Sequence, residues 1–435
     1  MNARTLAVTR LLRVEHEGAH VARLGGESGD PATARAASDY VAGVTRQRRY
    51  LDFLLASVVR PPLDTLDPPL LQALRIGAYD LVRGTPPHAA VGEAVGVVRD
   101  LLHRGAAGLA NASLRALARR LAAGDLPEPA GAPAERLATR HSHPTWMVRR
   151  WLDAWGAEAT EAFLRANNAV PRFALALTGG APSRPAALEA LAALGADPEP
   201  SRWHDGMVSV GRLQPVLRSD WWASGAARVQ DEAAALVVRV VDARPGEAIL
   251  DAAAAPGGKA VGLALALGGD GRVVALDVSE AKARLVRRAA ETTGAPALET
   301  AVGDLRTWAP DAHFDAVLLD APCSGTGVLA KRADLRWNRT SADLAALVGL
   351  QAALLDAAAR HVRPGGRLVY ATCSVEAVEN DVQVERFLAR HPAFAVEPVG
   401  DRVPAALRDG AVYRALPHVH DTDGAFAVRL RHTAP

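Results

Sequence analysis

The spacing of hydrophobic residues predicts that the first part of the chain, residues 1–125, is entirely helical. Apolar residues recur there at intervals of three and four, as on one face of an α-helix. Proline pairs separate these periodic segments. About five to seven helices packed as a bundle are therefore expected. The predicted helices are Leu6–Val14, Tyr40–Val59, Leu70–Leu81, Val91–Leu102 and Leu109–Leu121.

The pattern becomes mixed in the middle of the chain. Residues 126–138 are rich in proline and alanine, which is typical of a linker. Residues 139–229 begin with a helical run that reaches Asn168. A possible strand at Phe173–Leu177 and a helix near Ala186–Leu194 follow it. This combination predicts a small α+β module.

From residue 230 to residue 435, apolar strand-like segments alternate with helical ones. Such alternation predicts a parallel, doubly wound sheet of the Rossmann type. The expected fold is therefore multi-domain, with an all-α bundle, a small α+β module and an α/β domain. The predicted strands are Ala248–Asp251, Arg272–Asp277, Leu298–Val302, Ala316–Asp320 and Arg367–Thr372.

Composition narrows the class of protein. Hydrophobic residues make up 49% and charged residues 23% of the chain, as in ordinary globular proteins. No run of 18 uncharged apolar residues occurs, and the N-terminus lacks a secretory pattern, so no membrane span and a cytoplasmic location are expected. Residues 1–125 hold 16 basic and 12 acidic residues, whereas residues 230–435 hold 23 and 26. This uneven charge fits a nucleic-acid-binding module joined to an enzyme.

The two cysteines occupy equivalent positions in the predicted fold. Cys323 and Cys373 each follow a short apolar segment of the type that forms a buried parallel strand. Ligands bind at the carboxyl ends of such strands. A free cysteine more often packs in a core, but the paired placement favours chemistry. With two cysteines and no histidine at ligand spacing, neither a disulfide framework nor a metal site is expected.

A glycine-containing loop follows the first predicted strand of the α/β domain. Gly257 and Gly258 allow backbone N–H groups to approach a ligand at the start of a helix. A Walker loop would need glycine where Ala253 stands and a hydroxyl residue where Ala260 stands. The dinucleotide fingerprint is also absent. The loop is either a plain turn or the site of a cofactor without phosphates.

Carboxylates at the ends of the next strands favour the cofactor. Asp277 lies 20 residues after Gly257, the spacing at which a carboxylate meets ribose hydroxyls. Asp304 ends the third strand, where it can accept from an adenine amino group. S-adenosylmethionine, a nucleoside with an amino-acid tail, meets these demands. The predicted cofactor-binding residues are Ala253, Ala254, Ala255, Pro256, Gly257, Gly258, Lys259, Asp277, Asp304 and Asp320.

These motifs together resemble a known family over residues 230–435. The loop Ala253–Lys259, the acids, Asp320–Ser324 and Ala371–Val375 are similar to motifs of the RNA cytosine-5 methyltransferases. Further motifs of this kind are Asp334–Trp337, Glu379-Asn380 and Asp423–Phe426. Ala253 and Ala425 depart from the family pattern, which usually has cysteine and a large residue there, and Val378 stands where an acid is usual.

The front of the chain resembles the helical RNA-binding domain of the NusB family. The segments that carry this resemblance are Gly77–Leu81, Pro87–Val95 and Leu109–Arg115. A NusB-like front joined to such a catalytic half is similar to bacterial enzymes that methylate cytosine C5 in 16S ribosomal RNA. The combined resemblance covers nearly the whole chain.

The resemblance implies a covalent mechanism. Cys373 would attack cytosine C6 as a thiolate, which makes C5 nucleophilic. Asp320 would hydrogen-bond the cytosine edge, and Cys323 would help remove the C5 proton and release the product. Lys259 is the candidate cation beside the thiolate. The alternative is that Cys323 attacks, because DNA cytosine-5 methyltransferases use a cysteine that follows proline.

The expected substrate is an unpaired or loop cytosine of 16S ribosomal RNA, because the base must leave its stack to be attacked. A monomer that needs no metal is expected. Two alternatives remain: the same chemistry on another ribosomal or transfer RNA cytosine, and a catalytically silent RNA-binding assembly factor. The candidate RNA-contacting residues are Arg46, Arg48, Arg49, Arg140, Arg149, Arg150, Arg336 and Trp337.

Overall fold

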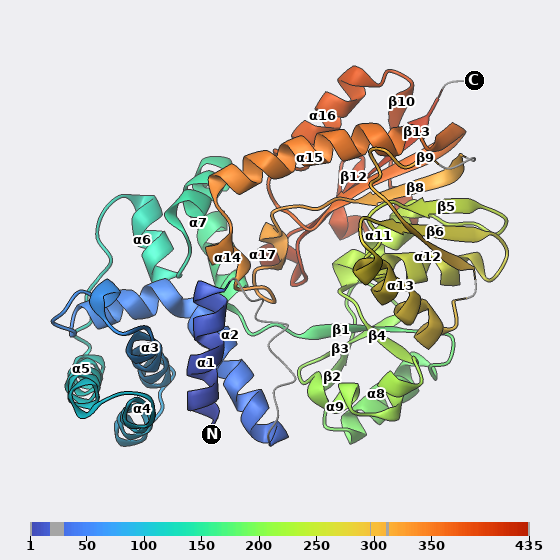
Figure 1. Ribbon diagram of the computed structural model, residues 1–435. Helices are drawn as coiled ribbons and strands as arrows, with labels where there is room; N and C mark the ends of the chain where they lie inside the picture. The colour runs from blue at the N-terminus through green and yellow to red at the C-terminus, as the bar shows by residue number, and fades with distance from the viewer. Residues whose placement is uncertain (1, 18–29, 296, 310–312, 434–435) are drawn as a thin grey trace. The chain divides into compact units, whose positions relative to one another are not determined.

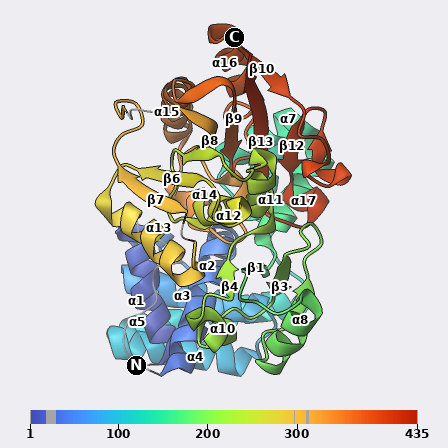
Figure 2. The same ribbon diagram turned by 90° about the vertical axis from the view of Figure 1, so that its right-hand side faces the viewer.

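The computed structural model describes residues 2–17, 30–295, 297–309 and 313–433. The chain forms two compact units (Figures 1 and 2). Unit 1 comprises Met1–Ala169 together with Leu329–Arg339, and unit 2 comprises Val170–Val328 together with Thr340–Pro435. A segment from the part of the sequence that was expected to form the α/β domain therefore belongs to the helical unit.

Unit 1 is helical, and all five helices predicted for residues 1–125 are confirmed. Fully buried leucines such as Leu54, Leu74 and Leu114 form its core. Several helices have proline in their first turn, where its missing N–H costs nothing. The helices are α1 (Ala3–His16), α2 (Pro31–Ala56), α3 (Pro68–Val82), α4 (Pro87–Leu101), α5 (Arg104–Ala123), α6 (Pro133–Arg140), α7 (Thr145–Asn168) and α14 (Leu335–Asn338), with a 3₁₀ turn η2 (Leu63–Thr65).

Two predicted boundaries differ from the arrangement in the structure. Helix α6 begins at Pro133, within the stretch 126–138 that was expected to be a linker. Proline breaks a helix internally but favours its first turn, so a proline-rich sequence hides this helix start. Helix α7 belongs to unit 1, although residues 139–229 were expected to form one module. The buried ring of Trp151 packs on Phe163 within α7, with centroids 4.8 Å apart.

Arg336 is a completely enclosed charged residue of unit 1. Its side chain is fully buried, and burial lowers the pKa of the guanidinium to about 9. Backbone carbonyls and one amide oxygen surround it and supply the acceptors that water would otherwise supply. It donates to the carbonyls of Arg46 (3.2 Å), Ser142 (3.1 Å), Asn167 (2.9 Å) and Leu329 (3.4 Å) and to Asn168 Oδ1 (2.8 Å).

Most of the predicted RNA-contacting residues instead hold unit 1 together. Arg46 is buried and donates to the carbonyl of Ala330 (3.0 Å), and Arg336 is enclosed as described. The prediction that these two arginines contact RNA is therefore corrected, because a buried guanidinium cannot reach a phosphate. Arg48 stacks on the ring of Trp337 at 4.2 Å.

Trp337 and Arg49 are also engaged inside unit 1. The indole Nε1 of Trp337 donates to the carbonyl of Thr45 (2.7 Å). Arg49 donates to the carbonyl of His143 (2.9 Å) and to the hydroxyl of Thr145 (2.8 Å). The sequence alone could not reveal these contacts, because nothing in it distinguishes an arginine at the surface from one that bonds to distant segments of the chain.

Three predicted RNA contacts remain accessible. The side chain of Arg140 is 52% exposed and pairs with Glu128 (2.8 Å). Arg149 is exposed and Arg150 is partly exposed on helix α7. These three stay predictions.

Unit 2 begins with a small antiparallel sheet in the order β2-β3-β1-β4. The predicted strand at Phe173–Leu177 is confirmed as β1, and the predicted helix near Ala186–Leu194 is α8. The elements are β1 (Phe173–Leu177), α8 (Arg184–Ala193), β2 (Pro198–Pro200), β3 (Met207–Val210), α9 (Gln214–Leu217), α10 (Asp220–Ala223) and β4 (Ala227–Val229).

Within the described residues, a nine-stranded sheet forms the centre of unit 2. Its order is β11-β12-β13-β9-β8-β5-β6-β7, with β10 paired to β13. The five predicted strands are its parallel part: β5 (Ala248–Asp251), β6 (Arg272–Asp277), β7 (Leu298–Val302), β8 (Phe314–Asp320) and β9 (Val362–Thr372). The antiparallel part was not predicted and comprises β10 (Phe394–Glu397), β11 (Arg408–Asp409), β12 (Val412–Ala415) and β13 (Ala425–His432).

Helices cover both faces of this sheet (Figure 1). Leu236 and Val261 of α11 and α12 pack on one face, and Leu355 and Phe387 of α15 and α16 pack on the other. The helices are α11 (Glu232–Val241), α12 (Gly258–Leu267), α13 (Glu280–Thr293), α15 (Ser341–Ala359), α16 (Asp381–Arg390) and α17 (Pro417–His420). Short 3₁₀ turns are η3 (Thr326–Val328), η4 (Gly400–Arg402) and η5 (Ala405–Leu407).

One helix, α15, is long and apolar enough by composition to cross a membrane, and it is the one such helix among the described residues. It carries Asp343 and Asp356, and its Leu344 and Leu355 are buried. Leu355 belongs to the core that α15 shares with β8 and β9. Helix α15 therefore packs on one face of the sheet.

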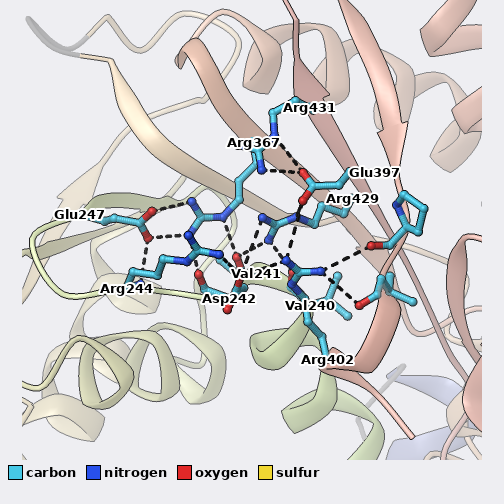
Figure 3. A network of polar contacts seen from close by, with 12 residues as sticks. Val240, Val241, Asp242, Arg244, Glu247, Arg367, Glu397, Arg402, Arg429 and Arg431 are labelled. Atoms are coloured by element: carbon cyan, nitrogen blue, oxygen red, sulfur yellow. Dashed lines mark hydrogen bonds and ion pairs between the residues drawn. The ribbon is translucent and has the colours of Figure 1, made fainter. Parts of the chain in front are cut away.

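Two arginines close the end of α11 (Figure 3). The last carbonyls of a helix have no partner within it. Arg367 Nε donates to the carbonyl of Val241 (2.6 Å), and Arg429 Nη1 donates to the carbonyls of Val241 (2.8 Å) and Val240 (3.1 Å). Arg429 also pairs with Glu397 (3.0 Å). These bonds fix α11 against β9 and β13.

Replacing Arg336 tests its contribution to unit 1. Arg336→Met keeps an apolar stem but leaves buried carbonyls without donors. We expect the free energy of unfolding, measured by urea titration of the helical signal, to fall by at least about 2 kcal/mol. Arg119→Met, at an exposed position of α5, is the control and should change it by less than about 0.5 kcal/mol. Equal effects of the two substitutions would contradict the role given to Arg336.

A second stability prediction compares two arginines of β13 that share the partner Glu397. Arg429 is 1% exposed, whereas Arg431 is 37% exposed. Arg429→Met should lower the free energy of unfolding by roughly 3 kcal/mol, because it removes a buried guanidinium that pairs with Glu397 and donates to the carbonyls of Val240 and Val241. Arg431→Met removes a surface ion pair worth less than about 1 kcal/mol. Thermal denaturation of both variants would show the difference, and a reversed order would contradict it.

Candidate active site

The two cysteines lie at the ends of adjacent parallel strands. Strands β8 and β9 pair with Asp320 opposite Ala371, so the segments that follow them start side by side. The Sγ atoms of Cys323 and Cys373 are 3.2 Å apart. The structure thus brings together the two thiols that the sequence placed at strand ends.

The environment of Cys323 affects the pKa of its thiol. The hydrogen bond to Cys373, then burial, raise the pKa of Cys323 well above its usual value. The negative charges of Cys373, Glu379 and Asp320 add to this shift. The environment of Cys323 therefore disfavours its thiolate form.

Lys259 supplies a positive charge to the same site. It stands in the first turn of α12, and its Nζ lies 2.6 Å from Asp320 Oδ2. Burial opposes the charge on this ammonium, but Asp320, Asp251 and Cys373 outweigh it and raise the pKa of Lys259. The side chain is 17% exposed, so it is a site residue and not a solvated surface lysine.

A cavity of about 120 Å³ opens beside the nucleophile candidates. Lys259, Asp320 and Cys373 contribute to its wall. The remaining wall residues are Asp231, Ala233, Ala234, Val237, Val328, Thr372, Asp423, Gly424 and Ala425.

Asp231 is a wall residue that was not predicted from the sequence. Its carboxylate caps α11 by accepting from the backbone N–H of Ala233 (2.9 Å). An aspartate before an apolar helix indicates an N-terminal cap. The sequence therefore gave no reason to expect that Asp231 also lines a cavity. Asp423 and Ala425 belong to a motif noted in the sequence, without an assigned role.

The cofactor loop has the close packing that glycine permits. Gly257 has φ +110°, and a Cβ there would lie 3.0 Å from Val286 Cα. The N–H of Ala255 donates to Asp277 Oδ2 (3.1 Å), which ties the loop to the end of β6. Arg228, from the small sheet, donates to the carbonyl of Gly258 (2.8 Å).

Carboxylates stand at the ends of β6 and β8 and just after β7. Asp277 is buried at the end of β6 and lies 3.1 Å from the ammonium of Lys282. Hydrogen bonds from the side chain and backbone of Arg306 lower the pKa of Asp304, after β7, to about 2. With Asp320 at the end of β8, these acids fit the ribose hydroxyls, adenine amine and ammonium of S-adenosylmethionine.

Asp251 is a buried acid that sequence reasoning passed over. It ends β5, directly before the loop, and it is 1% exposed. Burial, and then the charge of Asp320, raise its pKa to about 7. Its position at a strand end was visible in the sequence, but its burial was not.

No group of three or more His, Cys, Asp or Glu side chains that could hold a metal ion occurs within residues 2–17, 30–295, 297–309 and 313–433.

This doubly wound domain, with its glycine loop, acids and helical partner unit, belongs to an S-adenosylmethionine-dependent RNA methyltransferase. The model of the 16S rRNA methyltransferase RsmB/F family matches residues 238–431. The NusB family model matches residues 1–119, and the RsmF/B-like ferredoxin-like domain matches residues 143–216. The chain belongs to the ribosomal RNA small subunit methyltransferase B family, as its relatives show.

Curated relatives match most of the chain. The probable ribosomal RNA small subunit methyltransferase B of Bacillus subtilis is 32% identical, over 91% of this chain and 89% of that protein. The ribosomal RNA small subunit methyltransferase B of Klebsiella pneumoniae is also 32% identical, over 89% and 88%.

Solved structures have the same architecture. The crystal structure of PH0851 superposes with a TM-score of 0.81 and 25% identity, over 99% of both chains. NSun6 from Pyrococcus horikoshii, crystallised with SFG, an analogue of S-adenosylmethionine, has a TM-score of 0.60 and 19% identity, over 67% of this chain and 99% of that chain. This second likeness concerns the fold alone.

The raised pKa of Asp251 predicts a pH effect on stability. The folded state binds this proton more tightly than the unfolded chain, whose pKa is 3.8. The contribution is complete below about pH 4 and is lost as the pH rises through 7. Between about pH 5.5 and 8.5, Asp251→Asn should therefore gain on the order of 2 kcal/mol of unfolding free energy relative to the unsubstituted protein.

Asp304→Asn is the control for this experiment. The pKa of Asp304 is about 2, so the group stays ionised over the whole range. Its stability difference should be the same at both pH values. If the Asp251→Asn difference is also constant, Asp251 is not protonated near neutral pH.

Proposed function

We propose that the protein transfers a methyl group from S-adenosylmethionine to C5 of an unpaired cytosine in 16S ribosomal RNA, through a covalent bond between Cys373 Sγ and C6. The observation that carries this proposal is the thiol pair, whose sulfur atoms lie 3.2 Å apart and in which the pKa of Cys323 is raised well above its usual value. The names of the relatives and the NusB-like unit support ribosomal RNA as the substrate. We also propose that the enzyme acts as a monomer in the cytoplasm, without a metal.

The attack begins at Cys373. Its sulfur lines the cavity, and the nearby ammonium of Lys259 favours a negative charge there. Addition of the thiolate to C6 makes C5 an enamine carbon, which can accept a methyl group. Asp320, held by Lys259, would hydrogen-bond the cytosine edge and stabilise the N3-protonated adduct. Bound S-adenosylmethionine supplies the methyl group.

Release would follow from the change at Cys373. The thiolate and its hydrogen bond are main causes of the raised pKa of Cys323. Once Cys373 is bonded to C6, these causes are gone, and Cys323 ionises more readily. Cys323 gives its proton to water, and its thiolate then takes the C5 proton. The electrons of the C5–H bond form the C5–C6 double bond, the bond between Cys373 Sγ and C6 breaks with its electrons on the sulfur, and N3 returns to solvent the proton that it took up on attack. The pair returns to thiol and thiolate, and the whole transfer releases one proton.

The same observation opposes the reverse assignment. A nucleophile must be a thiolate, and the environment of Cys323 disfavours its ionised form. We therefore propose Cys373 as the attacking residue. The loop 253–259 and the acids Asp277, Asp304 and Asp320 are proposed to bind the cofactor. Arg140, Arg149 and Arg150 are proposed as RNA contacts.

Substitution of each cysteine tests the roles. Cys373→Ala should form no 5-methylcytosine and no protein–RNA adduct. Cys323→Ala should form the adduct and fail to release it, so a band of protein bound to RNA should accumulate on a denaturing gel. Bisulfite sequencing of 16S ribosomal RNA, from cells with and without the gene, should identify one cytosine that loses its methyl group.

The outcomes separate the alternatives. Full activity of Cys373→Ala, with loss of the adduct in Cys323→Ala, would reverse the assignment. Methylation lost from transfer RNA or another ribosomal site would correct the substrate. No change in any RNA would indicate a silent assembly factor.

A further inference from the structure

Two adjacent buried residues connect the segments that carry the cysteines. Glu379 and Asn380 lie between β9 and α16, and both side chains are completely buried. The mechanism above assigns them no part. The side chain of Glu379 bonds to the segment that carries Cys323, and the side chain of Asn380 bonds to the segment that carries Cys373.

Glu379 holds the residue that follows Cys323. Its Oε1 accepts from the backbone N–H of Ser324 (2.8 Å) and from Gln351 Nε2 (2.8 Å). Its Oε2 accepts from the hydroxyl of Ser324. Because a carboxylate can only accept, both donors of Ser324 are directed at Glu379, and the backbone beside Cys323 is fixed in position and orientation.

Asn380 holds the residues on either side of Cys373. Its Oδ1 accepts from the hydroxyl of Thr372 (2.6 Å), and its Nδ2 donates to the carbonyl of Ser374 (2.9 Å). The N–H of Ser374 in turn donates to Thr372 Oγ1 (3.3 Å). One amide group thus spans the nucleophile candidate from both sides.

Three buried hydroxyl groups link these two sets of bonds. The oxygen of Ser324 lies 3.1 Å from that of Ser374 and 3.3 Å from that of Thr326. Thr326 and Ser374 are 3.2 Å apart. Since the hydroxyl hydrogen of Ser324 goes to Glu379, its oxygen is left to accept from the other two.

We propose that Glu379 and Asn380 are positioning residues with separate tasks: Asn380 orients Cys373 for attack, and Glu379 orients Cys323 for release. This inference rests on the proposed covalent function. It is supported by geometry on both sides and by the charge of Glu379, which contributes to the raised pKa of Cys323.

The test measures the two halves of the cycle separately. Attack is followed with a 16S RNA transcript that contains 5-fluorocytosine, because fluorine at C5 cannot be removed and the adduct stays trapped. Release is followed with an ordinary transcript, as turnover of labelled methyl groups and as adduct on a denaturing gel.

Opposite results are expected for the two residues. Asn380→Ala should slow trapping on the fluorinated transcript by about 10²-fold, the cost of misplacing a reacting group by about 1 Å. It should accumulate no adduct on the ordinary transcript. Glu379→Ala should trap at the rate of the unsubstituted protein, but its turnover should fall by about 10²-fold while adduct accumulates.

Conservative variants guard against loss of folding. Asn380→Asp keeps the acceptor for Thr372 and loses only the donor to Ser374. Glu379→Gln keeps an acceptor for the N–H of Ser324 and loses one for its hydroxyl. Each should show a smaller effect in the same half of the cycle as the alanine variant. Glu385→Ala, at an exposed position of α16, is the matched control and should change neither half.

The results decide between separate tasks and general packing. If the Glu379 and Asn380 variants slow the same step, or slow both steps equally, the proposal is overturned. If the unsubstituted protein traps no fluorinated transcript and makes no 5-methylcytosine, the proposed function itself fails, and that failure is visible before any variant is compared.

Discussion

The parallel pairing of β8 with β9 is the constraint on which the active site depends. Hydrogen bonds between these strands set Asp320 opposite Ala371, so the two segments that follow begin at the same height. That register brings the sulfur atoms within 3.2 Å. A shift of one residue would turn either strand over and direct its terminal side chains to the opposite face. The raised pKa of Cys323 follows in part from this closeness, because the hydrogen bond with Cys373 is its largest cause.

Buried polar groups maintain this register in a domain whose core is mostly alanine, valine and leucine. Arg367 and Arg429 bind the carbonyls at the end of α11 and join that helix to β9 and β13. Asp231, at the other end of the same helix, lines the cavity. The arginine cluster in Figure 3 therefore supports a wall of the catalytic cavity from the opposite end of a helix of ten residues.

The sequence predicted the parts of the fold that depend on local pattern. The five parallel strands were predicted because buried strands are short, apolar and rich in β-branched residues. The short antiparallel strands β10 to β12 were missed, since two to four residues carry too little pattern. Helix α6 was hidden by the prolines around it. The loop 253–259 and the acids at the strand ends were predicted because each follows a strand directly.

Arg46 and Arg336 show where the sequence alone was insufficient. Arginine is the residue type that commonly binds RNA phosphates, but in the folded protein both side chains donate to carbonyl groups of distant segments. The same limit applies to Glu379 and Asn380, whose partners lie up to 55 residues away. The sequence by itself determined the longer helices and the parallel strands and predicted the cofactor loop and the reactive residues, because these depend on neighbours along the chain. Only the tertiary structure decided that the pKa of Cys323 is raised and which charges are buried, because both depend on distances between residues far apart in sequence.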